Sequence, residues 1–576
     1  MLARVLSGAI LGIEASPVWV EVDLAGGLPA LNMVGLPDTS VRESRDRVRS
    51  AIQNSGFSFP PRRITVNLAP AHLRKEGTSL DLPVAVGILL AAGTLSPERA
   101  EQLFFAGELS LDGSLRPVKG AISLALAAKG LGCRGILLPE LVAGEASVVE
   151  GIPVYPVRSL SQVVGFLSGD ENIEPLSMLE YSTGEMPAAG EEDLRDVAGQ
   201  AAARRALEVA AAGGHNLLLV GPPGAGKTML ARRLPGILPP LSREEAVETT
   251  RIHSAAGLSS QPGLIQRRPF RAPHHSISGV GLAGGGAIPR PGEVSLAHHG
   301  VLFLDELPEF KRGALEVLRL PMEEGKVIIN RSLLTLELPA RFMLVAAMNP
   351  CPCGQLGSAG RSCACTPHQI SGYRGRVSGP LLDRFDIHLE VPRVRAEDLG
   401  SRNGTESSAA VRRRVLDARA VQARRCARFA AQPILQTPAS QKKEGLPRER
   451  FAPATYPSEG NGQVTAVQPS TTGIIVGIEG GQSGAPGGLS RGAGAGQGAR
   501  CNAELTTSEI RDHCALDAAG KRLLHSAVDR LGLSARAYHR ILKVARTLAD
   551  LAGEERISQR HLGEAIQYRL LDRAVR

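Results

Sequence analysis

A glycine-rich loop between two apolar segments constrains the fold of this chain more than any other feature. Residues 221–228 have the sequence GPPGAGKT, which fits the phosphate-loop pattern G-x-x-x-x-G-K-[ST]. The apolar run LLLV at 217–220 predicts a buried strand before the loop, and TMLA at 228–231 predicts the start of a helix after it. In this context backbone N–H groups surround the phosphates of a nucleotide. The chain is therefore predicted to contain an α/β domain with a nucleotide site.

The residues of this loop have separate predicted roles. Gly221, Gly224 and Gly226 allow the backbone to close around the phosphates. Lys227 reaches the β and γ oxygens, and the Thr228 hydroxyl is a ligand for Mg²⁺. The loop thus predicts ATP and Mg²⁺ as cofactors.

A second apolar segment ends in two carboxylates. The run VLFL at 301–304 predicts a buried strand, and Asp305 and Glu306 follow it directly. Ligands of open α/β sheets lie at the carboxyl ends of the strands, so we expect Asp305 in the Mg²⁺ shell and Glu306 polarising the water that attacks the γ-phosphate. Taken alone, this motif is also typical of a strand followed by a solvated acidic turn. Together with the phosphate loop, it predicts ATP hydrolysis.

Composition limits the partners of this chain. Its 576 residues suffice for several domains, and a content of 43% hydrophobic and 21% charged residues is typical of soluble proteins. Aromatic residues make up only 3%, which argues against nucleic-acid binding through stacked aromatic platforms. The net charge of +9 suits a partner rich in phosphate.

The sequence also bears on the compartment. Glu14 interrupts the apolar N-terminal stretch, which argues against a signal peptide, and the apolar run near 84–92 is too short to cross a membrane. The eight cysteines are partly clustered, which favours reduced thiols or metal over a disulfide framework. We therefore expect a cytoplasmic protein.

Periodicity and composition divide the chain into six predicted segments. They are an N-terminal α+β domain (1–168), an acidic linker (169–194), an ATPase core (195–396), an arginine-rich helix (397–430), a low-complexity insertion predicted to be disordered (431–500) and a C-terminal helical region (501–576).

Three further polar residues follow apolar segments in the expected order. The run LVAAM at 344–348 predicts a strand, after which the Asn349 amide can hydrogen-bond the γ-phosphate and the attacking water. Arg384 lies in the turn LLDRFD, and Arg536 opens a C-terminal helix. A guanidinium can stabilise charge on a transferring phosphoryl group. Each arginine taken singly is more typical of a surface ion pair, and it is their order after the phosphate loop and the Asp305–Glu306 strand that favours the role at the phosphates.

Longer motifs in the same order support a family resemblance. They are VGLPD (34–38), VNLAPA (66–71), KEG (75–77), FRAPHH (270–275), NPCPCG (349–354) and LSARAYHRIL (533–542). Their order resembles the magnesium-chelatase-like group of AAA+ ATPases and, more narrowly, the bacterial ComM/YifB family. The resemblance covers most of the chain except about 431–500.

The resemblance implies an AAA+ phosphate-loop core of α/β/α layers with a C-terminal helical lid. In that family Asn349 is sensor 1, Arg536 is sensor 2 and Arg384 is a finger that reaches the nucleotide of a neighbouring subunit. Lys227 with Thr228, and Asp305 with Glu306, would be its two nucleotide motifs. A finger acting in trans implies a ring of subunits, and a hexamer is expected.

The resemblance also suggests what the motor acts on. ComM-type proteins are associated with ATP-driven branch migration that integrates incoming single-stranded DNA during natural transformation. An alternative is a chelatase-type subunit that remodels a partner enzyme inserting metal into a tetrapyrrole. A degenerate scaffold is a third alternative, which the intact nucleotide motifs oppose.

The N-terminal domain is expected to have a protease-like (S5-type) fold without the chemistry. Residues 73–89 and 107–117 resemble the proteolytic domain of Lon-type proteases, which use a serine–lysine dyad. The dyad serine aligns with Val84 and the lysine with Ile122. Neither side chain can act as nucleophile or base, so we predict no peptidase activity and a structural or DNA-contacting role.

Two cysteine pairs form a candidate metal site. Cys351 and Cys353 are separated from Cys363 and Cys365 by nine residues rich in glycine and serine. Four thiolates can bind Zn²⁺ tetrahedrally in a structural role. Because C-x-C is tighter than the usual C-x₂-C, a loop without metal remains the alternative.

Two basic segments are candidate DNA contacts. Residues 326–336 predict a β-hairpin whose tip carries Arg331, and Arg267 and Arg268 lie in a second basic stretch before His274 and His275. The two histidines are equally compatible with local hydrogen bonds.

Overall fold

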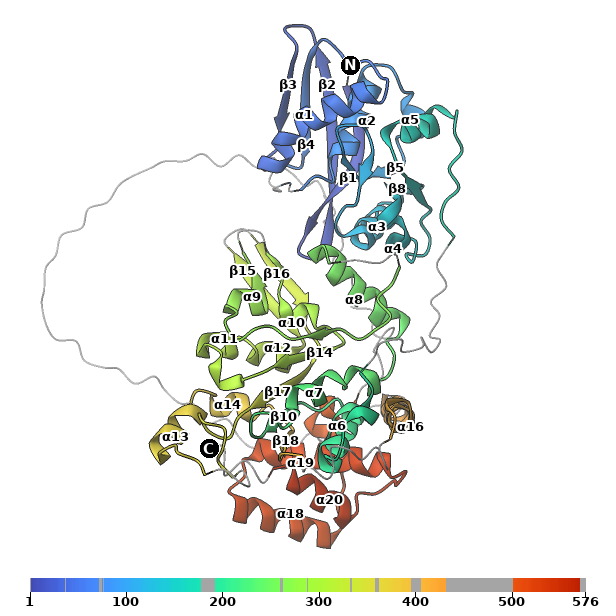
Figure 1. Ribbon diagram of the computed structural model, residues 1–576. Helices are drawn as coiled ribbons and strands as arrows, with labels where there is room; N and C mark the ends of the chain where they lie inside the picture. Colours follow the sequence, from blue (N-terminus) through green and yellow to red (C-terminus); the bar gives the residue numbers. More distant parts are fainter. Residues whose placement is uncertain are drawn as a thin grey trace, which may run out of the picture. The chain divides into compact units, whose positions relative to one another are not determined.

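The structure is a computed structural model that describes residues 2–36, 38–71, 75, 77–177, 192–258, 263–286, 289–331, 334–357, 362–394, 406–430 and 501–569 (Figure 1). Contacts group residues 1–426 and 498–576 into one unit and residues 427–497 into another. The predicted insertion 431–500 lies outside the described residues. Within the described ranges, no helix combines the length and the apolarity that a membrane crossing requires.

The N-terminal region contains a mixed seven-stranded sheet in the order β3-β4-β2-β1-β5-β8-β9. Its strands are β1 (Leu2–Leu11), β2 (Glu14–Ala25), β3 (Ala30–Val34), β4 (Arg63–Ala69), β5 (Leu103–Phe105), β8 (Gly135–Pro139) and β9 (Val154–Val157). Antiparallel pairs join β1 to β2, in a register that places Leu2 opposite Asp23, and β2 to β4. The remaining pairs in this sheet are parallel, and a separate small hairpin joins β6 (Glu108–Leu109) to β7 (Leu115–Arg116).

The helices of this region pack against the sheet and form two apolar clusters with it. One cluster includes side chains of α1 (Thr39–Asn54), α2 (Asp81–Ala91) and α5 (Leu160–Ser168), and the other includes those of α3 (Ala121–Gly130) and α4 (Glu140–Ala146). Every residue of α2 is buried, as its nearly unbroken apolar sequence requires. Val84 in α2 and Ile122 in α3, the positions aligned with the protease dyad, are both fully buried. A mixed α/β region is present, and the Lon-like assignment of this region remains a prediction.

The central region contains a five-stranded parallel sheet in the order β11-β14-β17-β10-β18. The strands are β11 (Phe270–Arg271), β14 (Val301–Leu304), β17 (Met343–Met348), β10 (Leu217–Val220) and β18 (Ile387–Glu390). The strands predicted at 217–220 and 301–304 are confirmed with these bounds. Because β14, β17 and β10 are parallel neighbours, their carboxyl ends meet at one edge of the sheet.

Helices and hairpins complete the central region. The helices are α6 (Ala201–Gly213), α7 (Lys227–Arg232), α8 (Arg243–Ala256), α9 (Gly279–Ala283), α10 (Glu293–Leu296), α11 (Arg312–Glu316), α12 (Arg319–Glu324), α13 (Pro367–Arg374) and α14 (Gly379–Leu382). Two hairpins pair β12 (Gly284–Gly285) with β13 (Arg290–Pro291) and β15 (Lys326–Arg331) with β16 (Leu334–Pro339).

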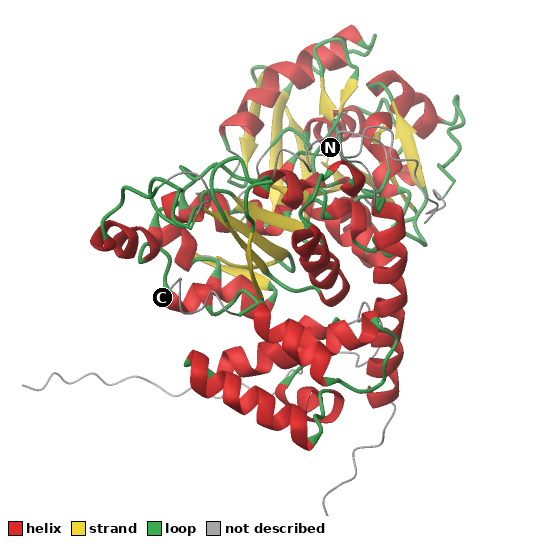
Figure 2. Cartoon of the chain, turned by 60° about the horizontal axis from the view of Figure 1, so that its bottom comes forward, coloured by secondary structure: helices red, strands yellow, loops and turns green. Residues whose placement is uncertain are grey.

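The arginine-rich segment (397–430) and the C-terminal region (501–576) are helical in their described parts, as predicted (Figure 2). The first contains α16 (Ser408–Ala430), and the second contains α17 (Thr507–His513), α18 (Ala518–Leu531), α19 (Ala535–Leu551) and α20 (Gln559–Gln567). Buried side chains of α19 share one apolar cluster with those of α6 and β10. The helical region is therefore packed directly on the sheet that carries the phosphate loop.

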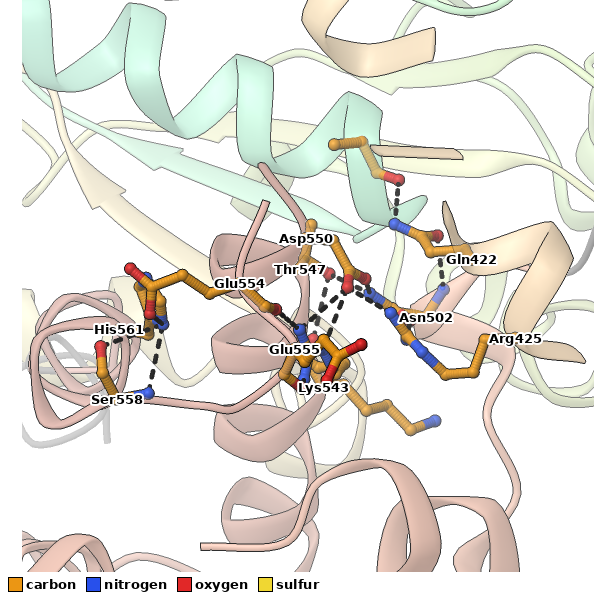
Figure 3. A network of polar contacts seen from close by, with 12 residues as sticks. Gln422, Arg425, Asn502, Lys543, Thr547, Asp550, Glu554, Glu555, Ser558 and His561 are labelled. Carbon is orange, nitrogen blue, oxygen red and sulfur yellow. Dashed lines mark hydrogen bonds and ion pairs between the residues drawn. The ribbon is translucent and has the colours of Figure 1, made fainter. Parts of the chain in front are cut away.

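The two sides of the predicted insertion meet in a buried polar network (Figure 3). The Asn502 N–H donates to Gln422 Oε1 at 3.2 Å, and Arg425 Nη1 donates to Asn502 Oδ1 at 3.2 Å. Asn502 Nδ2 in turn donates to Asp550 Oδ2 on α19 at 2.8 Å. Residues separated by about the length of the insertion are thus hydrogen-bonded to one another.

Candidate nucleotide site

The phosphate loop begins where β10 ends. The Gly221 N–H bonds the Met348 carbonyl of β17, which continues the strand ladder into the loop. Gly224 and Gly226 have φ values of +76° and +87°, a left-handed backbone that favours glycine. Gly226 caps α7, so Lys227 and Thr228 open that helix as predicted. The N-terminus of α7 is thereby turned toward the loop, which suits phosphate binding.

Lys227 connects the phosphate loop to Asn349. Its Nζ donates to the carbonyls of Gly221 at 2.7 Å and Pro222 at 3.0 Å, and to Asn349 Oδ1 at 3.1 Å. Burial lowers the pKa of Lys227, while the charges of Asp305 and Glu306 oppose that shift. A buried ammonium held by neutral oxygens is poised to gain from the negative charge of a phosphate.

Thr228 and Asp305 bring two oxygen-bearing side chains together at the sheet edge. The Thr228 hydroxyl donates to Asp305 Oδ2 at 2.6 Å. One hydroxyl and one carboxylate suit Mg²⁺, which binds few protein oxygens and keeps several waters. The residues present therefore fit the cation that the sequence predicts.

Glu306 has an unusual backbone conformation and lies near a histidine. Its φ of +52° is unusual for a residue other than glycine, and its N–H bonds Asp305 Oδ1 at 2.9 Å. His275 Nδ1 lies 3.6 Å from Glu306 Oε2, and the ring of His275 packs on that of His274 at 4.0 Å between centroids. In the sequence, His275 is compatible both with a DNA contact and with local hydrogen bonds. His275 follows β11, Glu306 follows β14, and these two strands are parallel neighbours. The strand order is therefore the signal that places His275 near Glu306.

Arg384 is held by residues of its own chain. Its Nη1 donates to the Pro380 carbonyl at 2.6 Å, its Nη2 pairs with Glu323, and its side chain is only 7% exposed. Burial lowers the pKa of Arg384, and the charge of Glu323 opposes that shift. Within the described part of the chain, these bonds do not join Arg384 to the phosphate loop.

The two arginines near the start of α19 have different environments. Arg536 is exposed in the first turn of α19. Arg540, one turn later, donates to Asp386 Oδ1 at 2.6 Å. Burial opposes charge on Asp386, but Arg540 and His215 outweigh it and hold the pKa of that carboxyl well below its usual range. Arg540 thus anchors α19 to the segment after Arg384 and leaves Arg536 exposed.

The four cysteines of the 351–365 loop lie together as predicted. The Sγ atoms of Cys351, Cys353 and Cys363 are 3.4 to 3.6 Å apart, and that of Cys365 lies within 4.8 Å of the other three. All four are free thiols. The four sulfur atoms are close enough together to be candidate ligands of one metal ion.

Glu248, His298 and His299 form a second compact group of potential ligands. The Arg341 N–H donates to His298 Nδ1 at 3.0 Å, so the proton of the neutral ring is on Nε2, which faces Glu248 Oε2 at 3.1 Å. A protonated Nε2 cannot bind a metal. This group is therefore a hydrogen-bonded cluster between α8 and the start of β14.

The candidate DNA contacts differ in how the structure uses them. The guanidinium of Arg268 donates to the Pro239 carbonyl at 2.6 Å and to Glu245 Oε2 at 2.9 Å, and so stabilises its own loop. Arg267 beside it is exposed. Arg331 ends β15 opposite Leu334, and its side chain lies outside the described parts of the structure. His274 bonds Ser276 Oγ at 2.9 Å, which is the local role.

Three parts of the chain match magnesium-chelatase families. Residues 193–399 match magnesium chelatase, subunit ChlI; residues 20–141 match subunit ChlI of Mg-chelatase; and residues 490–569 match the C-terminal region of subunit ChlI. The parallel sheet, the phosphate loop and the acidic strand end agree with these matches. Together they define a magnesium-chelatase-like AAA+ protein.

Similarity over the full length narrows this class. The chain is 43% identical to the protein YifB of Salmonella typhimurium over 99% of its own length and 98% of the relative's. It is 42% identical to the competence protein ComM of Haemophilus influenzae over the same shares. The magnesium-chelatase 38 kDa subunit of Acidiphilium rubrum is 26% identical over 30% of this chain and 50% of its own. The chain belongs to the ComM/YifB family.

Proposed function

We propose that this protein is a Mg²⁺-dependent ATPase whose turnover drives a motor acting on DNA. The observation that carries the ATPase proposal is the meeting of the phosphate loop with two other strand ends at one sheet edge, where Thr228 bonds Asp305 and Lys227 bonds Asn349. Bound Mg²⁺ supplies charge neutralisation at the β and γ phosphates. Lys227 and the N–H groups at the start of α7 bind those phosphates, and Thr228 and Asp305 hold the cation.

Glu306 and Asn349 act on the attacking water in this proposal. The Glu306 carboxylate orients the water and accepts its proton, and the Asn349 amide orients the same water against the γ-phosphate. His275 keeps the Glu306 carboxylate at this edge. Glu306→Gln is expected to bind ATP as the wild type does and to hydrolyse it at least about 100-fold more slowly.

The active site is completed by a second subunit in this proposal. Arg384 would leave Glu323 and reach the neighbour's γ-phosphate, while Arg536 approaches the nucleotide of its own chain from α19. The assembly is proposed to be a hexameric ring in the cytoplasm. Sedimentation with and without a nonhydrolysable ATP analogue tests it, and a protein that stays monomeric with nucleotide bound contradicts it.

The proposed substrate is branched or single-stranded DNA. Support comes from the full-length similarity to a competence protein, from the net charge of +9 and from the basic segments with Arg331, Arg267 and Arg268. The activity would be branch migration or helicase activity that promotes integration of incoming single-stranded DNA. The N-terminal domain would contact DNA or stabilise the ring, without peptidase activity.

We also propose zinc as the ion of the cysteine cluster.

The second candidate is a chelatase-type subunit that remodels a protein partner, supported by the three magnesium-chelatase matches. The ATPase rate with and without single-stranded or forked DNA separates the two. A DNA motor predicts stimulation that falls as salt rises, because phosphate contacts release counterions. An ATPase rate that no form of DNA changes would favour the subunit that remodels a protein partner. Lys227→Ala, which lacks the phosphate contact, is the control for both measurements.

A further inference from the structure

The cysteine cluster is joined to the phosphate loop through one glycine. Gly354 has a φ of +74°, and its N–H bonds the Cys351 carbonyl at 3.0 Å to close a tight turn. A Cβ built on Gly354 would lie 2.5 Å from Pro223 Cδ and 2.8 Å from Pro223 Cγ. Such distances are too short for non-bonded carbons, so the turn 351–354 is in direct van der Waals contact with the phosphate loop.

The same turn is fixed on its other sides by the nucleotide site and by α13. Asn349, which accepts from Lys227 Nζ, lies two residues before Cys351. Arg374 at the end of α13 donates to the Pro350 carbonyl at 3.1 Å. Cys363 and Cys365 lie just before Thr366, which caps α13. The first cysteine pair therefore lies in the turn that contacts the phosphate loop, and the second lies in the segment that leads into α13.

The thiols have the geometry of a closed zinc site. With Zn–S bonds of about 2.3 Å, a tetrahedral ion places its sulfurs about 3.8 Å apart. The distances of 3.4 to 3.6 Å between three of the four Sγ atoms are close to that value and far beyond a disulfide bond. Four sulfur ligands leave no position for water, so the ion has a structural role.

We propose that a zinc ion bound by Cys351, Cys353, Cys363 and Cys365 braces the phosphate loop by holding the 351–354 turn against Pro223. This inference rests on the proposed ATP-binding function and adds a metal that controls it. When the ion is removed, the turn loses its link to the segment before α13, and both Pro223 and Asn349 lose a fixed neighbour. Nucleotide affinity then falls, although none of the four zinc ligands belongs to the phosphate loop.

The test combines metal analysis with nucleotide binding on the purified full-length protein. Elemental analysis is expected to find about one zinc per chain, and Co²⁺ exchanged into the site should give the absorption of a tetrahedral thiolate complex. The double variant Cys353→Ser with Cys363→Ser should lose the metal and bind a fluorescent ADP analogue about tenfold more weakly. Cys133→Ser, outside the cluster, should keep both properties.

A second pair of variants leaves the thiols intact. Gly354→Ala places a methyl group against Pro223 and should weaken ADP binding while zinc is retained. Gly357→Ala is the matched control, because Gly357 also has a positive φ, +77°, but its Cβ would meet only Glu390 Oε1 at 3.9 Å. It should keep the wild-type affinity. Thermal unfolding of each variant separates local effects from loss of the fold.

The outcomes distinguish this inference from the proposed function. Wild-type protein without zinc, or a metal-free variant that binds ADP as tightly as the wild type, overturns the brace. A wild-type protein that holds zinc but binds no nucleotide, or a Lys227→Ala variant that binds it unchanged, overturns the ATPase proposal instead.

Discussion

The Thr228 hydroxyl donates a 2.6 Å hydrogen bond to Asp305 Oδ2, although 77 residues separate the two along the chain. Thr228 opens α7 after β10, and Asp305 follows β14, with β17 between the two strands. A parallel sheet brings these ends together, and the bond shows that both side chains turn toward the same point. The candidate cation site follows from this relationship.

Removing the Thr228 hydroxyl should weaken Mg²⁺ binding. Thr228→Ala is expected to lower the ATPase rate at saturating ATP by about 100-fold and to raise the Mg²⁺ concentration required, because one metal ligand is lost. Thr228→Ser keeps the hydroxyl and should retain most of the activity. Mg²⁺ titrations of the steady-state rate measure both effects. Equal rates for the alanine and serine variants would remove Thr228 from the metal site.

The contact between His275 and Glu306 should affect hydrolysis more than binding. His275→Ala is expected to lower kcat about tenfold, because the Glu306 carboxylate loses a neighbour that positions it, while the affinity for ADP stays unchanged. His274→Ala is the control, since His274 bonds Ser276 rather than Glu306. If both variants behave alike, the histidines act through local structure only.

The pairing of Arg384 with Glu323 should be broken in the active ring. Arg384→Ala is expected to abolish ATP hydrolysis without loss of ADP binding, because the arginine is not part of its own chain's phosphate loop. Mixing Arg384→Ala subunits with Lys227→Ala subunits should restore part of the activity, since some interfaces then combine an intact loop with an intact finger. Steady-state ATPase assays at several mixing ratios measure this rescue, and its complete absence would contradict a finger in trans.

Burial of His298 should make stability depend on pH. Burial lowers the pKa of His298 from 6.5 to about 4, although the Glu248 carboxylate opposes the shift. Between these values the unfolded chain binds more protons, so stability is present at neutral pH and lost as pH falls from 6.5 toward 4. The full shift corresponds to about 3 kcal/mol.

The thermal midpoint between pH 7 and pH 4.5 measures this dependence. The midpoint of the wild type should fall more steeply than that of His298→Gln, which has no group titrating at this position. His525→Gln, at an exposed position of α18, should parallel the wild type. Identical slopes for the wild type and His298→Gln would show that His298 does not titrate on unfolding.

The insertion should be dispensable for hydrolysis. Replacing residues 431–500 with a flexible linker of about ten residues is expected to leave the ATPase rate within about twofold, because closure entropy changes slowly with loop length. The hydrogen bonds of Asn502 to Gln422 and Arg425 join the two flanks without it. Asn502→Ala should instead lower the thermal midpoint, since it leaves buried polar groups unpaired. A deletion variant that unfolds at a lower temperature than Asn502→Ala would contradict this view.

Local pattern was sufficient to predict the strands that carry the nucleotide motifs. The runs at 217–220 and 301–304 are β10 and β14 with the predicted bounds, because four consecutive apolar residues before a polar or glycine-rich turn suit a strand buried on both faces. The family membership inferred from the motif order is confirmed by the full-length relatives. The domain boundaries and the Lon-like fold remain predictions.

The partners of individual side chains could not be predicted in the same way. Two adjacent arginines, Arg267 and Arg268, look equivalent in the sequence, but only Arg268 turns inward to Pro239 and Glu245. Arg536 and Arg540 lie one turn apart on α19, and it is Arg540 that pairs with Asp386. These choices depend on which carboxylates and carbonyls other elements bring near each guanidinium.

The sequence by itself determined the chemical groups of the nucleotide site and their order along the chain, because backbone conformation and buried strands are encoded by nearby residues. Only the tertiary structure decided that His275 faces Glu306, that Arg384 is held by Glu323 and that Gly354 packs on Pro223. The physical reason is that each of these contacts joins residues far apart in the chain. Their meeting depends on sheet order and packing, which no local pattern specifies.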